Sequence, residues 1–442
     1  MATKIKTVPG TQPVAPERPI RAPEESASRA QRGVLLAHPG TQHSCQAALA
    51  LQQAGLLRRY ITGFYFKPDS VLGRMARWLP DGLRAKFMRE LYRRHRPGLA
   101  PANVKMFPAA ELIFVASSRL ALLRKFSENV LRWRNEHFDA RVARLLAREK
   151  PAAVICYDTC ARRAFEKAKS LGIRCMLDQS IGHIRTSLVL YREEAELHPD
   201  FADSLPTSVP EELVERCTRE ALLADCILSP SDYVRQSLIE IGVEASRIAA
   251  VPYGVDVERF RPAPKRAPGK FRVLFVGQLS QRKGIKYLLE AFRGLRCPDA
   301  ELLLVGPVIG SGKGLKPYSP LYTRVPPVPH AEMPHWFQQA DLFVYPSLHE
   351  GSALSIYEAL ACGLPVITTL HSGSVVRDGV EGYIVPIRDV EALREKIELL
   401  YENAELRGEM SRRARARAEE FSWAAYGRRL GAVLWRVLQA DP

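Results

Sequence analysis

One lysine and two glutamates in the second half of the chain could bind a phosphorylated ligand rich in hydroxyl groups. Lys283 follows an apolar stretch, 271–276, and precedes a helical pattern that begins near Gly284. A lysine ammonium can neutralise a diphosphate, and the free N–H groups of a helix N-terminus favour anions. The carboxylates of Glu350 and Glu358 can each accept two hydrogen bonds, which suits a diol. Glu358 interrupts an otherwise apolar stretch, so a surface role for it is disfavoured.

The elements that must position these residues alternate between short apolar runs and helical patterns. Such alternation predicts parallel sheets covered by helices on both faces. In the first half, the sequence predicts strands at 33–37, 60–65, 153–157, 174–178, 226–229 and 248–251, helices at 44–57, 68–102, 138–149, 161–171, 211–224 and 232–241, and a short element at 112–116. In the second half, it predicts strands at 271–276, 301–305, 342–345 and 366–368, and helices at 284–295, 332–339, 354–361, 390–402 and 405–438.

A chain of 442 residues is too long for one ordinary domain. Residues 1–30 are polar and rich in proline and charge, which predicts a disordered tail. Several prolines and basic residues in 253–270 predict a linker. We therefore expect a Rossmann-like domain at 31–252 and another at 271–420, with a ligand cleft between them.

The composition limits the class of protein. The formal net charge is +16, which favours phosphate-bearing partners, although a generally basic proteome would give the same surplus. Residues 71–100 combine eight Lys/Arg with interleaved aromatic and aliphatic residues. This make-up fits an interfacial amphipathic helix or an ordinary surface helix with a basic face, and both readings stay open. We expect a cytoplasmic protein, because there is no secretory h-region or long apolar run and the eight cysteines are scattered.

Several short motifs in the second half follow one another in an order typical of a known family. They are VPYGVD at 251–256, FVGQL at 275–279, RKG at 282–284, LVG at 304–306, YPS at 345–347, EGSALSIYE at 350–358 and ALACGLPV at 359–366. Together they resemble glycosyltransferase family 4, a family of retaining enzymes with the GT-B fold of two facing Rossmann-like domains. The resemblance covers roughly 220–436 and extends more weakly into the first domain. Residues 421–442 resemble the family's closing helix, which returns to the first domain.

The resemblance implies roles for the residues of these motifs. It implies that Lys283 and Glu350 act in catalysis, and that Glu358 holds the ribose of a nucleotide-sugar donor. The remaining donor-binding residues that it implies in this domain are Gln278, Arg282, Val328, His330, Ser352, Ala353 and Leu354, the last three through their backbone N–H groups. The family usually has arginine where this chain has Gln278, and Arg282 lies close enough in sequence to compensate.

Two candidates lie in the first domain. Gly40 sits in the turn after the first strand, where glycine allows the backbone to approach a phosphate or a sugar. By resemblance, His183 approaches the donor sugar and takes part in catalysis, although the register from Asp178 to His183 is not a clean match. A structural role for each of these residues is the alternative.

The function that follows is a retaining, metal-independent hexosyltransferase that acts on a nucleotide-sugar and a glycan or lipid-linked acceptor. Polysaccharide or glycolipid synthesis is the expected context, with the protein in the cytoplasm or peripheral on the inner face of the membrane. We expect no cofactor, no metal site and no nucleic-acid partner. A non-catalytic GT-B module that binds an anionic partner and a nucleotide-sugar epimerase are the alternatives. In this family the donor phosphate is usually described as taking the acceptor proton, so no protein base is named.

Overall fold

The computed structural model of the chain describes residues 33–40, 42–76, 78, 80–119, 126–263 and 269–439. The predicted tail, 1–30, lies outside these ranges, as does 264–268 of the predicted linker. All eight cysteines fall within the described ranges and are unpaired, and all but the half-buried Cys45 are buried. They are therefore free thiols.

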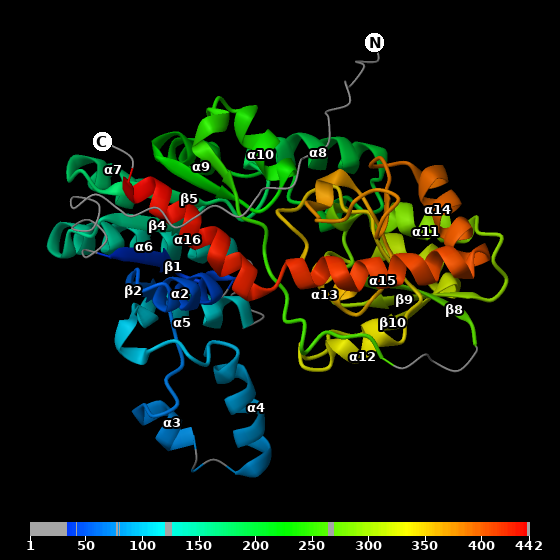
Figure 1. Cartoon of the computed structure of the whole chain (residues 1–442), viewed down its shortest axis with the longest axis horizontal. Helices are drawn as coiled ribbons and strands as arrows, with labels where there is room; N and C mark the ends of the chain where they lie inside the picture. The colour runs from blue at the N-terminus through cyan, green and yellow to red at the C-terminus, as the bar shows by residue number, and fades with distance from the viewer. Residues whose placement is uncertain are drawn as a thin grey trace.

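The first half of the chain folds around a parallel sheet with the order β3-β2-β1-β4-β5-β6-β7 (Figure 1). Its strands are β1 (Val34–His38), β2 (Leu57–Thr62), β3 (Val104–Met106), β4 (Ala153–Tyr157), β5 (Arg174–Asp178), β6 (Cys226–Ser229) and β7 (Ile248–Ala250). The order reverses between β1 and β4, so the chain runs outward in both directions from this pair. In open sheets of this kind, ligands bind beyond the carboxyl ends of the strands at such a reversal.

Both faces of the first sheet are buried. Successive side chains of β1 point to opposite faces: Val34 and Leu36 belong to one core, and Leu35 and Ala37 to another. The first core also contains residues of α2 (Ser44–Gln53) and α16 (Trp423–Gln439). The second contains residues of α6 (Ser127–Glu149), α7 (Arg162–Ser170), α9 (Glu211–Leu223) and α10 (Asp232–Ile239). This two-sided burial explains the nearly continuous apolar strands.

The second half forms another parallel sheet, with the order β10-β9-β8-β11-β12-β13. Its strands are β8 (Phe271–Val276), β9 (Ala300–Val305), β10 (Tyr322–Val325), β11 (Leu342–Tyr345), β12 (Val366–Thr368) and β13 (Gly382–Ile384). Its helices are α11 (Ile285–Arg293), α12 (Met333–Gln338), α13 (Leu354–Ala361), α14 (Val390–Glu402) and α15 (Ala404–Glu420). The two sheets lie side by side, each with its own helices, which confirms the expected two-domain α/β architecture.

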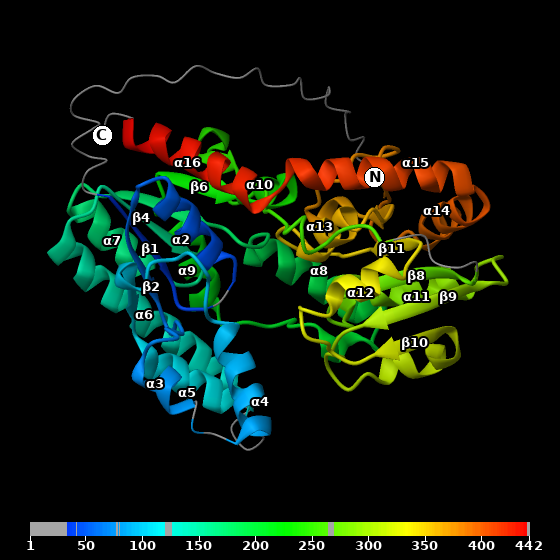
Figure 2. The ribbon, with the colours of Figure 1, turned by 60° about the horizontal axis from the view of Figure 1, so that its bottom comes forward.

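The chain returns to the first domain at its C-terminal end. α15 covers the second domain and α16 lies against the first, where it packs on α2 (Figures 1 and 2). The predicted helix at 405–438 is therefore two helices, which meet at Phe421. The Val255 N–H donates to the Phe421 carbonyl at 2.9 Å, and a Cβ on Gly254 would lie 2.6 Å from the Trp423 nitrogen. The crossing between domains and the returning helix thus pack so tightly that only glycine fits at 254.

Some elements differ from the sequence-based expectation. Residues 112–116 lie within the long helix α5 (Pro108–Arg119), and the helix predicted at 138–149 begins at 127. No helix was predicted between 178 and 211, where α8 (Ile184–Leu197) lies, and the short strands β3, β10 and β13 were not predicted either. The predicted strand at 60–65 starts earlier, at 57.

The basic segment folds as a helical hairpin of α3 (Val71–Ala76) and α4 (Asp81–Tyr92). The hairpin projects away from the rest of the first domain in both ribbon views (Figures 1 and 2). Of the helices that the structure describes, none is both long enough and apolar enough to cross a bilayer.

Candidate active site

Lys283 ends a tight turn, Gln281–Lys283, between β8 and α11. Gly284 follows it with a φ of 68°, and a Cβ at Gly284 would lie 2.0 Å from the Pro346 carbonyl oxygen. Because a side chain fits neither the backbone angle nor the space, glycine is required there. The turn thereby holds the Lys283 side chain under the loop that follows β11, where only 7% of the residue is exposed.

Glu350 contacts two cationic side chains of the site. Its Oε1 contacts the Lys283 ammonium and lies 2.9 Å from the Arg282 guanidinium. Burial and the neighbouring Arg282 guanidinium lower the pKa of Lys283 well below its usual value, and the contact with the Glu350 carboxylate opposes that shift. Arg282 also donates to Gln278 Oε1 at 3.1 Å. The structure therefore brings together four of the predicted site residues.

The predicted ribose ligand, Glu358, lies on α13 with its carboxylate mostly buried. His330, from the loop between β10 and α12, contacts it: His330 Nε2 lies 2.7 Å from Glu358 Oε1. The His330 side chain is 61% exposed, so it can move aside for a ligand. Val328, from the same loop, is half-buried against the main core, and Met333 is buried at the start of α12.

The backbone donors predicted at 352–354 lie at the N-terminus of α13. The Ala353 N–H donates to the Ser372 carbonyl at 3.1 Å, so this donor is already used inside the domain. Ser352 contributes its hydroxyl to the same loop packing, because its Oγ donates to the Gly373 carbonyl at 2.6 Å. Leu354 opens the helix and its side chain is 39% exposed.

The loop that carries Glu350 also packs against the first domain. The Gly182 N–H donates to the Glu350 carbonyl at 3.2 Å, and a Cβ on Gly351 would lie 1.8 Å from the Ser180 carbonyl oxygen. Only glycine at 351 allows this approach. Tyr233 and His349 complete the contact, with 2.7 Å between the phenol oxygen and Nδ1.

His349 was not singled out from the sequence, although it directly precedes Glu350. Burial and the Arg282 charge lower the pKa of His349 to about 3, so its ring is neutral near pH 7. A neutral ring can hold the Tyr233 contact without adding a third positive charge beside Arg282 and Lys283.

The side chains of the first-domain candidates make contacts within their own domain. His183 is fully buried at the start of α8, where its Nδ1 accepts a hydrogen bond from the Arg185 N–H at 3.3 Å. Its Nε2 lies 3.5 Å from Thr218 Oγ1, so both ring nitrogens face groups of the first domain. Asp178 pairs with His43 Nε2 at 2.9 Å.

Gly40 lies directly after β1. A Cβ there would meet the His38 ring at 3.1 Å. A side chain at this position would crowd the ring of His38. Packing therefore favours glycine here, in addition to the ligand approach expected from the sequence.

The second half of the chain matches a known family. Residues 256–417 fit the family described as "Glycosyl transferases group 1". This span contains the second sheet and its helices through most of α15, together with Lys283, Glu350 and Glu358.

Curated relatives match this chain over part of their length. The chain is 31% identical over 203 residues to the D-inositol 3-phosphate glycosyltransferase of Paenarthrobacter aurescens (strain TC1), covering 41% of this chain and 50% of the relative. It is 33% identical over 235 residues to the protein of the same name from Mycobacterium tuberculosis (strain ATCC 25177 / H37Ra), covering 46% and 48%. The chain thus matches about half the length of these relatives.

Solved structures match almost the whole chain. Sucrose-phosphate synthase from Thermosynechococcus elongatus superposes with a TM-score of 0.61 at 18% identity, covering 92% of this chain and 100% of that one. Anabaena HepE in complex with UDP gives 0.59 at 13% identity, covering 91% and 99%. At these identities the likeness concerns the fold, and it confirms the GT-B architecture.

Proposed function

We propose that this chain transfers a sugar from a nucleotide-sugar donor to a hydroxyl group of a glycan or lipid-linked acceptor. The observation that carries the proposal is the pair of cations, Arg282 and Lys283, held by Glu350 within the group 1 glycosyltransferase domain. Such a pair can neutralise a diphosphate leaving group as its charge develops. The bond between the anomeric carbon and the diphosphate oxygen breaks, and the acceptor oxygen bonds to that carbon.

In this reaction Glu350 and Glu358 act as ligands rather than as acid and base. Glu350 releases part of its hold on Lys283 when the diphosphate arrives, and it then faces the donor sugar. Glu358 exchanges His330 for the ribose hydroxyls. The acceptor proton passes to the departing phosphate, and the transfer retains the anomeric configuration, which the coupling constant of the anomeric proton in the product measures.

The donor is the first question to test. HepE was crystallised with UDP, so we propose a UDP-sugar as the donor to try first. Thermal unfolding is measured with UDP, GDP and ADP, because a ligand that binds only the folded state raises the melting temperature. We expect one nucleotide to raise it, and we expect Glu358→Ala and Lys283→Ala to abolish the effect.

Lys316→Ala is the matched control, because Lys316 is an exposed lysine of the same domain. It should leave the nucleotide effect unchanged. If no nucleotide raises the melting temperature of the unaltered protein, the proposal is wrong. Nucleotide binding without turnover of any donor would instead favour a non-catalytic module.

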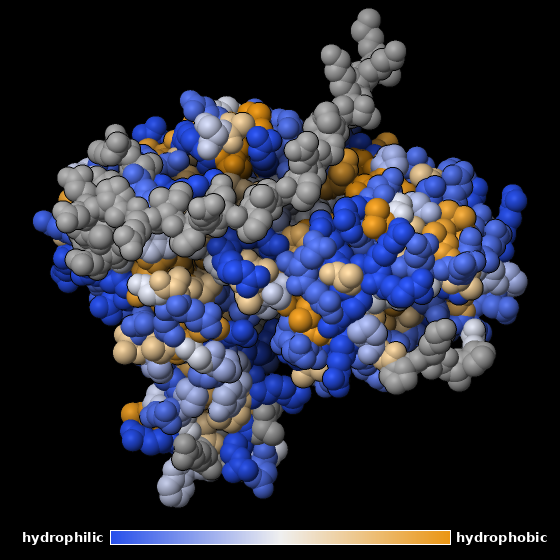
Figure 3. Space-filling model, in the orientation of Figure 1, coloured by the Kyte–Doolittle hydropathy of each residue, from blue (hydrophilic) through white to orange (hydrophobic). Residues whose placement is uncertain are grey.

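The projecting hairpin supports a lipid-linked acceptor. Trp78, Met75 and Leu83 are 90%, 63% and 62% exposed. The exposed arginines Arg74 and Arg89 lie among them. In the space-filling view the hairpin carries hydrophilic and hydrophobic atoms side by side (Figure 3). Exposed aromatic and aliphatic side chains beside cations suit the boundary between lipid headgroups and acyl chains.

Vesicle sedimentation tests this part of the proposal. We expect the protein to sediment with vesicles of anionic phosphatidylglycerol and to stay in solution with neutral phosphatidylcholine. The double variant Trp78→Ser/Arg89→Ser should lose binding to the anionic vesicles, whereas Arg144→Ser, on α6, should not. Equal binding of both variants would remove the membrane from the proposal and leave the sugar transfer intact.

A further inference from the structure

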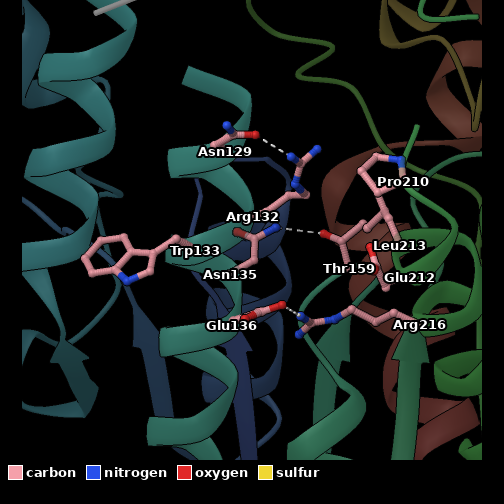
Figure 4. Close-up of a pocket in the computed structure, with 10 residues that line it drawn as sticks. All are labelled: Asn129, Arg132, Trp133, Asn135, Glu136, Thr159, Pro210, Glu212, Leu213 and Arg216. Carbon is pink, nitrogen blue, oxygen red and sulfur yellow. Dashed lines mark hydrogen bonds and ion pairs between the residues drawn. The ribbon is translucent and has the colours of Figure 1, made fainter. Parts of the chain in front are cut away.

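A cavity of about 340 Å³ lies between α6 and α9 in the first domain (Figure 4). It opens above the carboxyl end of β4, next to the reversal of strand order, where ligands of open α/β sheets bind. Its volume is within the range of about 300–1,000 Å³ that is typical of small-molecule sites. The lining residues are Asn129, Arg132, Trp133, Asn135, Glu136, Thr159, Pro210, Glu212, Leu213 and Arg216.

The lining offers many hydrogen-bonding groups and no excess of charge. Arg132 and Arg216 are balanced by Glu136 and Glu212. Arg216 is already committed, because it is buried and its guanidinium lies 2.9 Å from Asp139 and 3.1 Å from Glu220. Mixed donors and acceptors without net charge suit the hydroxyl groups of a neutral sugar.

The side chains converge from both helices. Asn135 donates from Nδ2 to Thr159 Oγ1 at 2.9 Å, and Arg132 donates to the amide oxygen of Asn129. In the close-up these groups point between α6 and α9, whereas the Trp133 ring turns away from them (Figure 4). That ring packs on His137, with 4.4 Å between centroids. The cavity therefore offers a ligand hydrogen-bonding groups rather than the face of this ring.

A second cavity, of about 220 Å³, lies where the two domains meet. Both are lined by Thr159. The second is also lined by Gly182, Tyr191 and His349, and so it reaches the loop that carries Glu350. Thr159 has a φ of 73°, a left-handed backbone angle that is uncommon for threonine. The two cavities thus share one lining residue with an uncommon backbone angle, and the second cavity lies beside the candidate active site.

Asp158 lines the second cavity as well. Its Oδ1 accepts a hydrogen bond from Ser180 Oγ at 2.6 Å, and burial raises the pKa of the Asp158 carboxyl above its usual value. The Ser180 carbonyl in turn packs closely against Gly351. Ser180 therefore links the Asp158 carboxyl to the loop that carries Glu350. It provides a hydrogen-bond acceptor for a sugar hydroxyl at the inner end of the two cavities.

We propose that the two cavities form one groove for the acceptor glycan, an inference that rests on the proposed sugar transfer. The reacting hydroxyl lies in the inner cavity near His349. A neutral, hydroxyl-rich unit farther along the acceptor fills the outer cavity between α6 and α9. Asn129 and Arg132 are specificity residues at this outer end, because both present hydrogen-bonding groups from the exposed side of α6.

Saturation-transfer NMR tests the groove with glucose, mannose, galactose, N-acetylglucosamine and myo-inositol as probes. We expect at least one of them to receive saturation from the unaltered protein. The double variant Asn129→Ala/Arg132→Ala should reduce that signal at least severalfold. Arg144→Ala, an exposed arginine on the same helix outside the cavity, should leave it unchanged.

Three results would overturn the groove: no probe receives saturation, the double variant keeps the full signal, or Arg144→Ala loses it too. The nucleotide effect on the melting temperature is measured on the same samples. If it persists in the double variant while the probe signal falls, the groove is supported and the donor site is intact. If no nucleotide binds the unaltered protein, the proposed sugar transfer fails whatever the probes show.

Discussion

Glu194 of the first domain accepts a hydrogen bond at 2.7 Å from Gln281 Nε2 of the second domain. The Glu194 carboxylate is fully buried and also accepts from the Tyr287 hydroxyl at 2.9 Å and from the Arg388 guanidinium. Gln281 begins the turn that carries Arg282 and Lys283. One buried carboxylate on α8 therefore fixes the domain contact and the position of the turn that carries Arg282 and Lys283.

Removing this charge should weaken both stability and nucleotide binding. Glu194→Gln keeps the shape of the side chain but leaves Arg388 without its buried partner, a change that typically costs about 3 kcal/mol. We expect that loss in urea unfolding, together with a weaker nucleotide effect because the turn is less well positioned.

The neighbouring Glu193→Gln is the matched control. Glu193 pairs with the same Arg388 at 2.8 Å, but its side chain is 48% exposed. Exposed pairs contribute roughly 0–1 kcal/mol. If the two variants lost equal stability, the role assigned to Glu194 would be wrong.

Gln278→Arg should tighten binding of the nucleoside diphosphate. Gln278 already lies beside Arg282, so an arginine there adds a third cation to the site. Charge-assisted hydrogen bonds to phosphate are strong, and we expect about a tenfold gain in affinity for UDP that shrinks at high salt. Calorimetric titration with UDP and with uridine makes the comparison. An equal gain for uridine, which has no phosphate, would contradict the assignment.

The contact between α16 and α2 depends on a glycine. A Cβ on Gly427 would lie 3.0 Å from the Ala50 Cβ, so a larger side chain would push the helices apart. Gly427→Leu should lower the free energy of unfolding by about 1–3 kcal/mol. A Cβ on Gly408, on α15, would meet no atom within 4 Å, so Gly408→Leu should be neutral or stabilising. Thermal unfolding of both variants measures the difference, and similar losses would contradict this view of the contact.

His183 should make the protein sensitive to acid. Burial lowers the pKa of His183 to about 4, whereas an unfolded histidine titrates near 6.5. Between these values the unfolded chain binds the proton and the folded chain does not, so stability is lost as pH falls through this window. The slope from one such group is at most about 1.4 kcal/mol per pH unit.

His183→Asn retains an acceptor that can cap α8 and removes the titrating group. Urea unfolding at several pH values between 7 and 4 compares the two proteins. We expect the variant to lose less stability than the unaltered protein over this range. Equal slopes would show that His183 does not titrate in this window.

Much of the fold could be predicted because its strands are buried on both faces. The bounds of β4, β5, β6, β8 and β11 agree with the apolar runs in the sequence. α8 was missed because its buried face includes Glu194, whose partners lie in the other domain. A glutamate in a helical pattern predicts an exposed position, because its partners in the other domain cannot be inferred from the sequence. The three-residue strand β13 offers too little sequence for any pattern.

The same reason limits what the sequence says about the site. Lys283, Glu350 and Glu358 belong to motifs that follow in order, so they could be identified by resemblance. The contact of Tyr233 with His349 joins residues 116 positions apart, and that of Glu194 with Gln281 joins residues 87 apart. No local pattern records such pairs. His183, which the resemblance placed near the donor sugar, lies at a helix start with its ring facing Thr218.

The return of α16 to the first domain also has a consequence for biosynthesis. The strands of the first sheet leave the ribosome early, but α16, with Leu430 and Leu434 in the same core as Met176 of β5, is translated only after the whole second domain. Until then, α16 does not yet cover its side of the first sheet, and apolar side chains there are exposed to solvent. The nascent first domain should therefore bind chaperones that recognise apolar surface, and it should release them once residues near 430 have emerged.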